Sequence, residues 1–254
     1  MIDVSSPGAL VFLLVAGLLA GGVNAVAGGG SLLVFPALLA VGFPPLAANV
    51  TNSVAQWPGY LGIVAGARRE LRGQGRRILL TSGVAVVGAA IGCALLLVLP
   101  GEVFDTVVPV LVLLASVVMA LGPWIKKRIG TPDAGAPDRN AGLLPSVFFA
   151  SIYGGYFGGA LGVILVATLS LCVGDELRRV NALKGLLSLV IATVTVAVFA
   201  FGAPVDWLAV ALLAPTTLIG GFLGAKLARR LPESVLRWAV VVLGVGVAIY
   251  LFLT

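Results

Sequence analysis

Long uninterrupted apolar runs, separated by short polar stretches, dominate the hydrophobic pattern of this chain. Residues 9–27, 78–99 and 236–253 form three such runs, and each is long enough to cross about 30 Å of hydrocarbon as a helix. The runs are continuous, whereas the strands of a transmembrane β-barrel alternate apolar and polar positions. The pattern therefore predicts an all-α, polytopic membrane protein.

The stretch 28–52, GGGSLLVFPALLAVGFPPLAANVTN, interrupts this pattern with glycines, prolines and uncharged polar residues. Three consecutive glycines are a poor helix interior, so we predict a break at Gly28–Gly30 and a helix with Ser31 as its N-cap. Irregular backbone at membrane depth is tolerated where protein buries it or where it lines a cavity. For residues 9–66 we predict a full helix, a short broken segment and a second helix.

A shift of 132 residues overlays the chain on itself without a gap. The matching positions include Gly30 and Gly162, Asn49 and Asn181, and Pro100 and Pro232. Such self-similarity indicates a structural repeat. We predict an N-terminal membrane repeat at 9–125, a cytoplasmic linker at 126–140 and a C-terminal membrane repeat at 141–254.

Loop charges predict opposite orientations for the two repeats. The loop 68–77 carries five arginines and the turn 101–105 carries only acidic charges, so the positive-inside rule places the first in the cytoplasm and the second outside. Their counterparts, 200–209 and 232–237, receive the opposite assignment. We therefore predict two inverted-topology repeats with about eight to ten transmembrane or half-membrane helices and a binding site at the midplane. The N-terminus is expected outside, in a cell (plasma or inner) membrane.

The composition restricts the kinds of site, reaction and partner that we expect. The chain is 60% hydrophobic, has no histidine and carries a net charge of +6, and its basic residues cluster in loops, where membrane orientation explains them. Cys93 and Cys172 lie inside apolar segments, so we expect no metal site and no cofactor. The sequence contains no nucleophile motif that would indicate an enzyme. The expected partners are the lipid bilayer and a small anion, not nucleic acid, and we also consider a homodimer.

Candidate binding residues fall at repeat-related positions. Asn52 and Gln56 share one helix face, and the 132-residue shift matches them to Lys184 and Ser188. An ionisable residue within a membrane segment is a functional candidate; the alternative for Lys184 is that it snorkels to the membrane interface. A helix beginning at Ser31 would also present free amides to an anion.

All ten carboxylates lie in or near loops and segment ends. A cation pathway or an acidic proton relay needs a carboxylate inside the membrane, so the interior chemistry is neutral-polar plus cationic and favours an anionic substrate. Trp57, beside Gln56, either walls the site or is an interfacial aromatic residue.

Three motifs carry a resemblance to a known family. Residues 28–52, VNALKGLLSLV at 180–190 and IGGFLGAKLARRLP at 219–232 resemble motifs of the sulfite exporter TauE/SafE family of permeases. The resemblance implies transport of sulfur-containing anions such as sulfite or organosulfonates, often outward. It also implies a substrate-site role for the Gly28–Ser31 break, Thr51, Asn52 and Lys184.

We therefore predict a permease that exports such anions by alternating access between two repeats. The alternative is an importer or a channel-like conductor of the same or another small anion. The predicted substrate-binding residues are Gly29, Gly30, Ser31, Thr51, Asn52, Gln56, Trp57, Asn181, Lys184 and Ser188.

Overall fold

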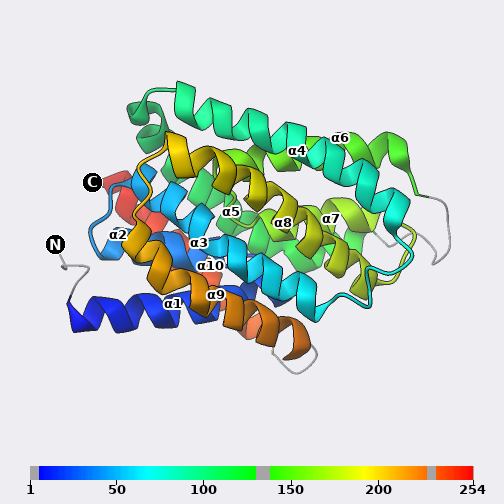
Figure 1. The fold of residues 1–254 in the computed structure, drawn as a ribbon, viewed down its shortest axis with the longest axis horizontal. Coiled ribbons are helices and arrows are strands. Elements are labelled where there is room, and N and C mark those ends of the chain that lie inside the picture. Colours follow the sequence, from blue (N-terminus) through cyan, green and yellow to red (C-terminus); the bar gives the residue numbers. More distant parts are fainter. Residues whose placement is uncertain (1–5, 130–137, 228–232, 254) are drawn as a thin grey trace.

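The computed structural model describes residues 6–129, 138–227 and 233–253, and these residues form ten helices and no strand (Figure 1). The helices are α1 (Pro7–Val26), α2 (Ser31–Ala40), α3 (Pro45–Gly66), α4 (Gly75–Val98), α5 (Gly101–Ile129), α6 (Asn140–Tyr156), α7 (Leu161–Cys172), α8 (Leu177–Gly202), α9 (Trp207–Leu227) and α10 (Glu233–Leu253). The all-helical prediction is confirmed, and the number of helices lies within the predicted range.

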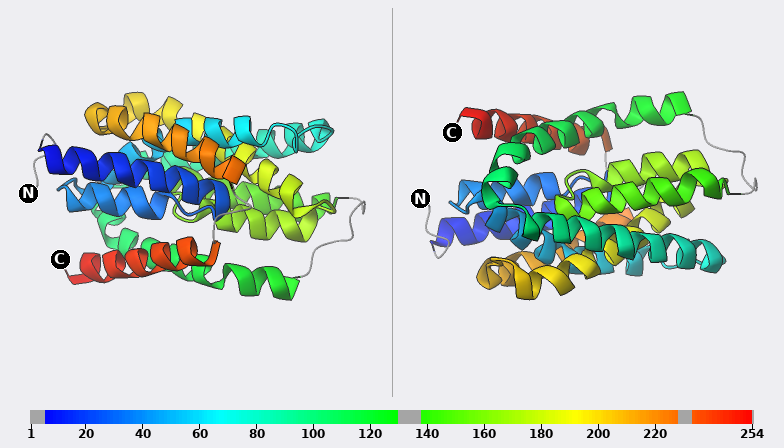
Figure 2. Two further views of the ribbon diagram at one scale, coloured as in Figure 1. Left: turned by 90° about the horizontal axis from the view of Figure 1, so that it is seen from below. Right: turned by 90° about the horizontal axis from the view of Figure 1, so that it is seen from above.

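Most helices run along one common axis, so the bundle has two ends (Figures 1 and 2). We call the end that carries residues 66–77 and 173–179 the basic end. The opposite end, which we call the acidic end, carries the first turn of α5 with Glu102 and the start of α9 after Asp206. Both described termini of the chain lie at the acidic end (Figure 2).

Helix length separates full spans from partial ones. Among the described residues, five helices are long and apolar enough to cross a membrane: α1, α4, α8, α9 and residues 101–124 of α5. By contrast, α2 has 10 residues and α7 has 12, which at 1.5 Å per residue is too short for the hydrocarbon core. These two are the short broken segments that the sequence predicts.

The helix boundaries follow the 132-residue shift. Helices α3, α4 and α5 begin at residues 45, 75 and 101, and α8, α9 and α10 begin at residues 177, 207 and 233. In addition, α1 begins at the acidic end and α6 at the basic end (Figure 2). The inverted relationship and the domain boundaries drawn from it remain predictions.

The two chain breaks touch each other at the centre of the bundle. Gly28, which separates α1 from α2, has a φ of +83°, and Gly158 and Ala160, which separate α6 from α7, have φ values of +75° and +52°. The amide of Gly162 donates to the carbonyl of Gly28 at 3.2 Å. A side chain at either position would meet the other backbone, so the glycines permit this close crossing.

Small residues let helices from the two halves of the chain pack closely. Helix α1 packs against α9, and α6 packs against α4. A Cβ added to Gly88 would lie 2.6 Å from the Phe148 carbonyl oxygen, and one added to Gly224 would lie 2.8 Å from the Gly22 Cα. These glycines therefore serve helix packing.

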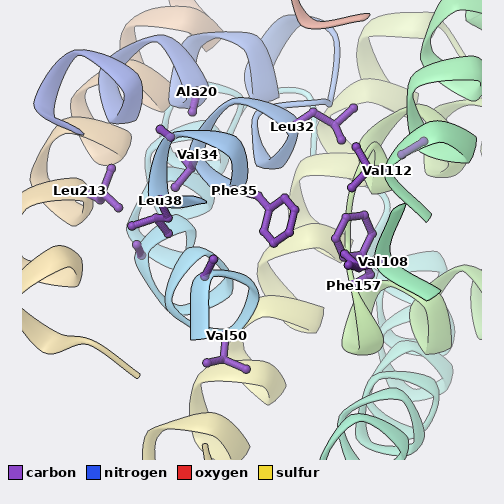
Figure 3. Close-up of a cluster of buried hydrophobic side chains, with 14 of the residues drawn as sticks. Ala20, Leu32, Val34, Phe35, Leu38, Val50, Val108, Val112, Phe157 and Leu213 are labelled. Carbon is purple, nitrogen blue, oxygen red and sulfur yellow. The ribbon is translucent and has the colours of Figure 1, made fainter. Parts of the chain in front are cut away.

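Helix α2 is enclosed by apolar side chains (Figure 3). Phe35 packs edge-on against Phe157, with 5.5 Å between ring centroids, and Leu32 and Leu38 are fully buried. Pro36, which lies within α2, is buried as well. Packing against α1, α3, α5 and α10 thus fixes a helix too short to be stable alone.

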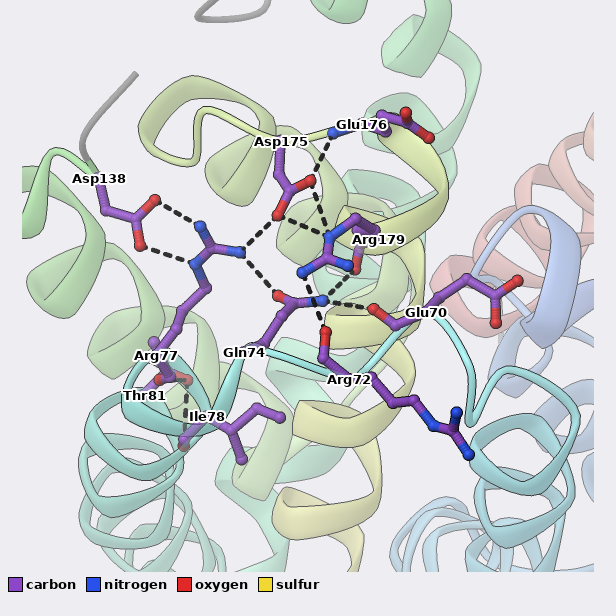
Figure 4. A network of polar contacts seen from close by, with 10 residues as sticks. All are labelled: Glu70, Arg72, Gln74, Arg77, Ile78, Thr81, Asp138, Asp175, Glu176 and Arg179. Carbon is purple, nitrogen blue, oxygen red and sulfur yellow. Dashed lines mark hydrogen bonds and ion pairs between the residues drawn. The ribbon is translucent and has the colours of Figure 1, made fainter. Parts of the chain in front are cut away.

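A network of ion pairs joins three segments at the basic end (Figure 4). Arg77 of α4 makes two 2.7 Å bonds to the Asp138 carboxylate and one of 3.0 Å to Asp175. Arg179 also binds Asp175, at 2.9 Å, and Gln74 donates to the backbone carbonyls of Glu70 and Arg179. The network ties the start of α4 to the segments that precede α6 and α8.

Candidate functional site

Asn24, in the last turn of α1, is the hub of a buried polar cluster. Its side-chain carbonyl accepts from the amide of Gly30 at 2.7 Å, which satisfies a backbone donor at the chain break. Its side-chain amide donates to Oε1 of Gln56 on α3. One side chain therefore joins the break to the adjacent helix.

Gln56 extends the cluster along α3. Its Nε2 donates to Oδ1 of Asn52 at 3.0 Å and to Oγ of Ser31 at 3.2 Å. The four-residue spacing of Asn52 and Gln56 on one helix face is as predicted. All of these side chains are at least 90% buried, so their bonds form away from bulk water.

Lys184 lies in the interior and does not snorkel to the interface. It is 2% exposed and sits seven residues into α8, about 10 Å from the start of that helix. Its ammonium donates to the carbonyl of Asn24 at 3.0 Å and lies 3.5 Å from the carbonyl of Ala25. These carbonyls lie in the last turn of α1, where they lack intrahelical partners.

Asn49 and Asn181, matched by the repeat, make equivalent bonds. The side-chain amide of Asn49 donates to the carbonyl of Tyr156 at the end of α6, at 3.0 Å. That of Asn181 donates to the carbonyl of Ala25 near the end of α1, at 3.3 Å. Each asparagine therefore caps the broken helix of the other half of the chain.

Ser31, Gln56 and Ser188 line one small cavity of about 20 Å³, which Tyr60 also borders. Tyr60 lies against Ser31 and Asn24. A space of this size holds about one water molecule. The structure thus brings these three predicted residues to a single small cavity.

Other predicted residues lie outside this cluster. Thr51 accepts the amide of Asp206 at 3.0 Å and so holds the loop before α9. The indole of Trp57 donates to Thr193 on α8 at 2.9 Å, and Trp57 does not border the small cavity. Gly29 packs against the side chain of Met119.

The predicted N-cap role of Ser31 is wrong. Gly30 occupies the N-cap position, and Ser31 is the first residue of α2. The Ser31 hydroxyl accepts from Gln56 and caps no backbone amide of α2. The amides of Leu32 and Leu33 bind the carbonyls of Gly29 and Gly30. The free amides expected at this helix start are therefore largely paired in this conformation.

A second, larger cavity of about 820 Å³ opens at the basic end, and we call it the vestibule. Its charged lining consists of Arg68, Arg69, Glu70, Arg178 and Lys226. Ala25 and Asn181 also line it, which places the capped end of α1 on its wall. The vestibule therefore borders the same helix end that Lys184 holds.

Aromatic side chains fill the corresponding region near the acidic end. Phe157, which the repeat matches to Ala25, is 2% exposed, and so is Phe104. Their ring centroids are 6.5 Å apart, and Tyr156 lies 5.9 Å from Phe104. A phenylalanine thus occupies the place at which the basic end has an alanine.

Sequence reasoning missed Asn24, although a signal was available. Asn24 is the single polar side chain in the apolar run 9–27, and a buried polar group in a membrane segment needs a partner.

Within the described residues, no group of three His, Cys, Asp or Glu side chains could hold a metal ion. The site therefore consists of one buried cation and neutral hydrogen-bonding groups.

Comparison with known proteins gives a consistent match along the chain. Residues 13–251 match the family model described as "Sulfite exporter TauE/SafE". The chain is 27% identical over 241 residues to a "Probable membrane transporter protein" of Haemophilus influenzae, covering 92% of this chain and 91% of the relative. It is 30% identical over 238 residues to "Probable membrane transporter protein YfcA" of Escherichia coli K12, covering 90% and 82%.

Proposed function

The chain belongs to the sulfite exporter TauE/SafE family of membrane transporters, and from this premise we propose that it exports small sulfur-containing oxyanions such as sulfite or organosulfonates. The observation that carries the proposal is the buried ammonium of Lys184. Among the described residues with buried polar side chains, Lys184 is the one that is charged, and the others are neutral. A cation buried among neutral polar groups favours an anionic ligand, because burying a charge in a low dielectric is costly and an anion would offset that cost.

Oxyanion binding requires the cluster to open. The cavity beside Ser31, Gln56 and Ser188 has room for about one water molecule, and a sulfite ion is larger. An arriving anion would replace the carbonyls of Asn24 and Ala25 as the partner of Lys184, while Gln56 and the serine hydroxyls donate to its oxygens. Separation of α1 from α8 at this point would provide the space.

Alternating access is the mechanism that fits this arrangement. The vestibule opens the basic end as far as the capped end of α1, whereas Phe104 and Phe157 fill the acidic end. We propose that these are the open and closed sides of one carrier conformation, and that the opposite conformation opens the acidic end. By the positive-inside rule the basic end faces the cytoplasm.

The membrane potential supports export. Moving one elementary charge through 100 mV is worth about 2.3 kcal/mol, and an inside-negative potential drives anions outward. Export would therefore need no coupled ion. The alternatives are import of the same anions and channel-like conduction of these or other small anions.

The deciding experiment is flux by the purified full-length chain in liposomes. We would compare sulfite, sulfate, thiosulfate, sulfoacetate and taurine, and we expect saturable flux of at least one sulfur oxyanion. Lys184→Met keeps much of the side-chain length, removes the charge and should abolish this flux. Arg76→Gln removes an exposed charge at the same end and should leave the flux unchanged.

Counterflow separates a carrier from a channel. Labelled sulfite should accumulate transiently against an excess of unlabelled sulfite on the other side if one site alternates between the two faces. Steady anion conductance without counterflow would overturn the carrier mechanism. If the wild type transports none of the five compounds, the substrate proposal is overturned.

A further inference from the structure

The vestibule differs in charge from the rest of the polar surface at the basic end. Four cationic side chains and one carboxylate line it. Its backbone lining is made of small residues, among them Ala65, Gly66 and Ala182, which leave the space open. With about 820 Å³, the vestibule can hold a hydrated oxyanion together with several water molecules.

Cations at the basic end differ in whether a carboxylate neutralises them. Arg77 and Arg179 are neutralised by Asp138 and Asp175 in the network of Figure 4. In contrast, the four vestibule cations, Arg68, Arg69, Arg178 and Lys226, make no ion pair with a carboxylate of the described residues. Lys226 instead lies over the ring of Phe222, 4.2 Å from its centroid. Glu70 is the single carboxylate among the vestibule's lining residues, so four cations against one carboxylate leave this lining with a net positive charge.

The inner wall of the vestibule leads to the buried cation. Asn181, on that wall, donates to the carbonyl of Ala25, and the same carbonyl lies 3.5 Å from the ammonium of Lys184. A single backbone segment, the end of α1, thus separates the vestibule from Lys184. An anion held in the vestibule would face that segment from one side while Lys184 holds it from the other.

We propose that the vestibule is a second anion site, which collects a small oxyanion at the basic end before it reaches Lys184. The proposal rests on the proposed function and adds the place and the residues of recruitment. Arg178 on α8 and Lys226 on α9 both line the vestibule and attract the anion by charge. The end of α1 is the barrier between the two sites.

The kinetic test compares two variants that change charge at the same end. Arg178→Gln with Lys226→Gln removes two vestibule cations, and Arg76→Gln, whose residue lies in a separate surface cavity with Arg77, is the matched control. For sulfite presented to the basic end, the double variant should raise KM roughly three- to tenfold and leave kcat unchanged. The effect should fade in about 0.5 M salt, where the screening length is a few ångströms.

Anionic lipid headgroups share the chemistry of the proposed ligand, so the measurement uses two liposome compositions. A KM shift of equal size in phosphatidylcholine alone and with phosphatidylglycerol supports a free oxyanion. A shift that appears only with phosphatidylglycerol would mean that lipid headgroups occupy the vestibule and would overturn the proposal. So would an equal shift in Arg76→Gln, or no shift in the double variant.

Direct binding separates this proposal from the transport function. Calorimetric titration of sulfite into the purified Lys184→Ala chain should still show salt-sensitive binding, which the two glutamine substitutions should remove. Retained binding without any flux in the wild type would overturn the proposed function and leave the vestibule site standing. Flux in the wild type, with no binding to the Lys184→Ala chain, would overturn the vestibule site alone.

Discussion

Lys184 donates its ammonium to the backbone carbonyl of Asn24 at 3.0 Å, across 160 positions of sequence. The same Asn24 uses its side chain to hold Gly30 and Gln56. The charge of α8, the chain break after α1 and the polar face of α3 are therefore connected through one residue. A change in the partner of Lys184 would be transmitted to the break through Asn24, whose side chain binds the Gly30 amide.

Replacement of Asn24 by leucine should destabilise the protein. The change leaves the Gly30 amide and the Gln56 side-chain carbonyl without their partner, and each buried unpaired group costs about 1–3 kcal/mol. We expect a loss of about 2–4 kcal/mol in the free energy of unfolding, measured as a lower thermal midpoint in detergent. Ser53→Ala, at a residue that lines the small cavity and bonds only its own helix, should shift it little. Equal midpoints for the two variants would contradict the hub role.

Gly162→Ala should disrupt the crossing of the two breaks. The new Cβ would lie 2.5 Å from the Cα of Gly28 and 2.8 Å from its carbonyl oxygen, and both are backbone atoms that cannot rotate away. Overpacking of this kind costs about 1–3 kcal/mol or more, so we expect low yield of folded protein and a reduced thermal midpoint. The measurement is size-exclusion elution together with thermal unfolding.

Gly83→Ala is the matched control for this crossing. A Cβ at Gly83 would meet nothing within 4 Å, and alanine favours a helix by about 1 kcal/mol over glycine. The control variant should therefore be as stable as the wild type or more stable. A tolerated Gly162→Ala would show that the breaks can separate without loss of the fold.

Local signals in the sequence were enough to predict the helix pattern. The glycine triplet placed the first break, and the 132-residue shift placed the start of α8, α9 and α10 relative to α3, α4 and α5. Glycine conformation and helix length are properties of short segments, so a single sequence carries them. The sequence allowed two interpretations of Lys184, a position inside the membrane segment or snorkelling to the interface. Its burial agrees with the first.

Long-range partners were beyond what the sequence could specify. Ser31 has a typical N-cap side chain, yet Gln56, 25 residues away, engages its hydroxyl. The repeat matched Asn49 to Asn181, but not the helix ends that they cap, because those carbonyls belong to the other half of the chain. The family resemblance placed Thr51 in the predicted site, and Trp57 was included because it follows Gln56. In the structure Thr51 binds the amide of Asp206, and Trp57 binds Thr193.

Thermal stability should fall in acid because of the network at the basic end. Burial raises the pKa of Asp175, but hydrogen bonds from Arg179 and Arg77 outweigh burial, and the pKa of this carboxyl lies below its ordinary value of 3.8. A lowered folded-state pKa means that the carboxylate contributes stability above the unfolded value and loses it as pH falls through the folded value. The wild type should therefore lose stability from about pH 4 downward, measured as the thermal midpoint against pH.

Asp175→Asn removes the titrating group and should flatten this part of the profile. The variant should be less stable than the wild type at pH 7, since Arg77 and Arg179 lose their shared carboxylate, and the difference should shrink as pH falls below 4. Glu176→Gln, at the adjacent exposed residue, should keep the wild-type profile. A constant difference between Asp175→Asn and the wild type at every pH would show that Asp175 stabilises the protein through packing and not through its charge.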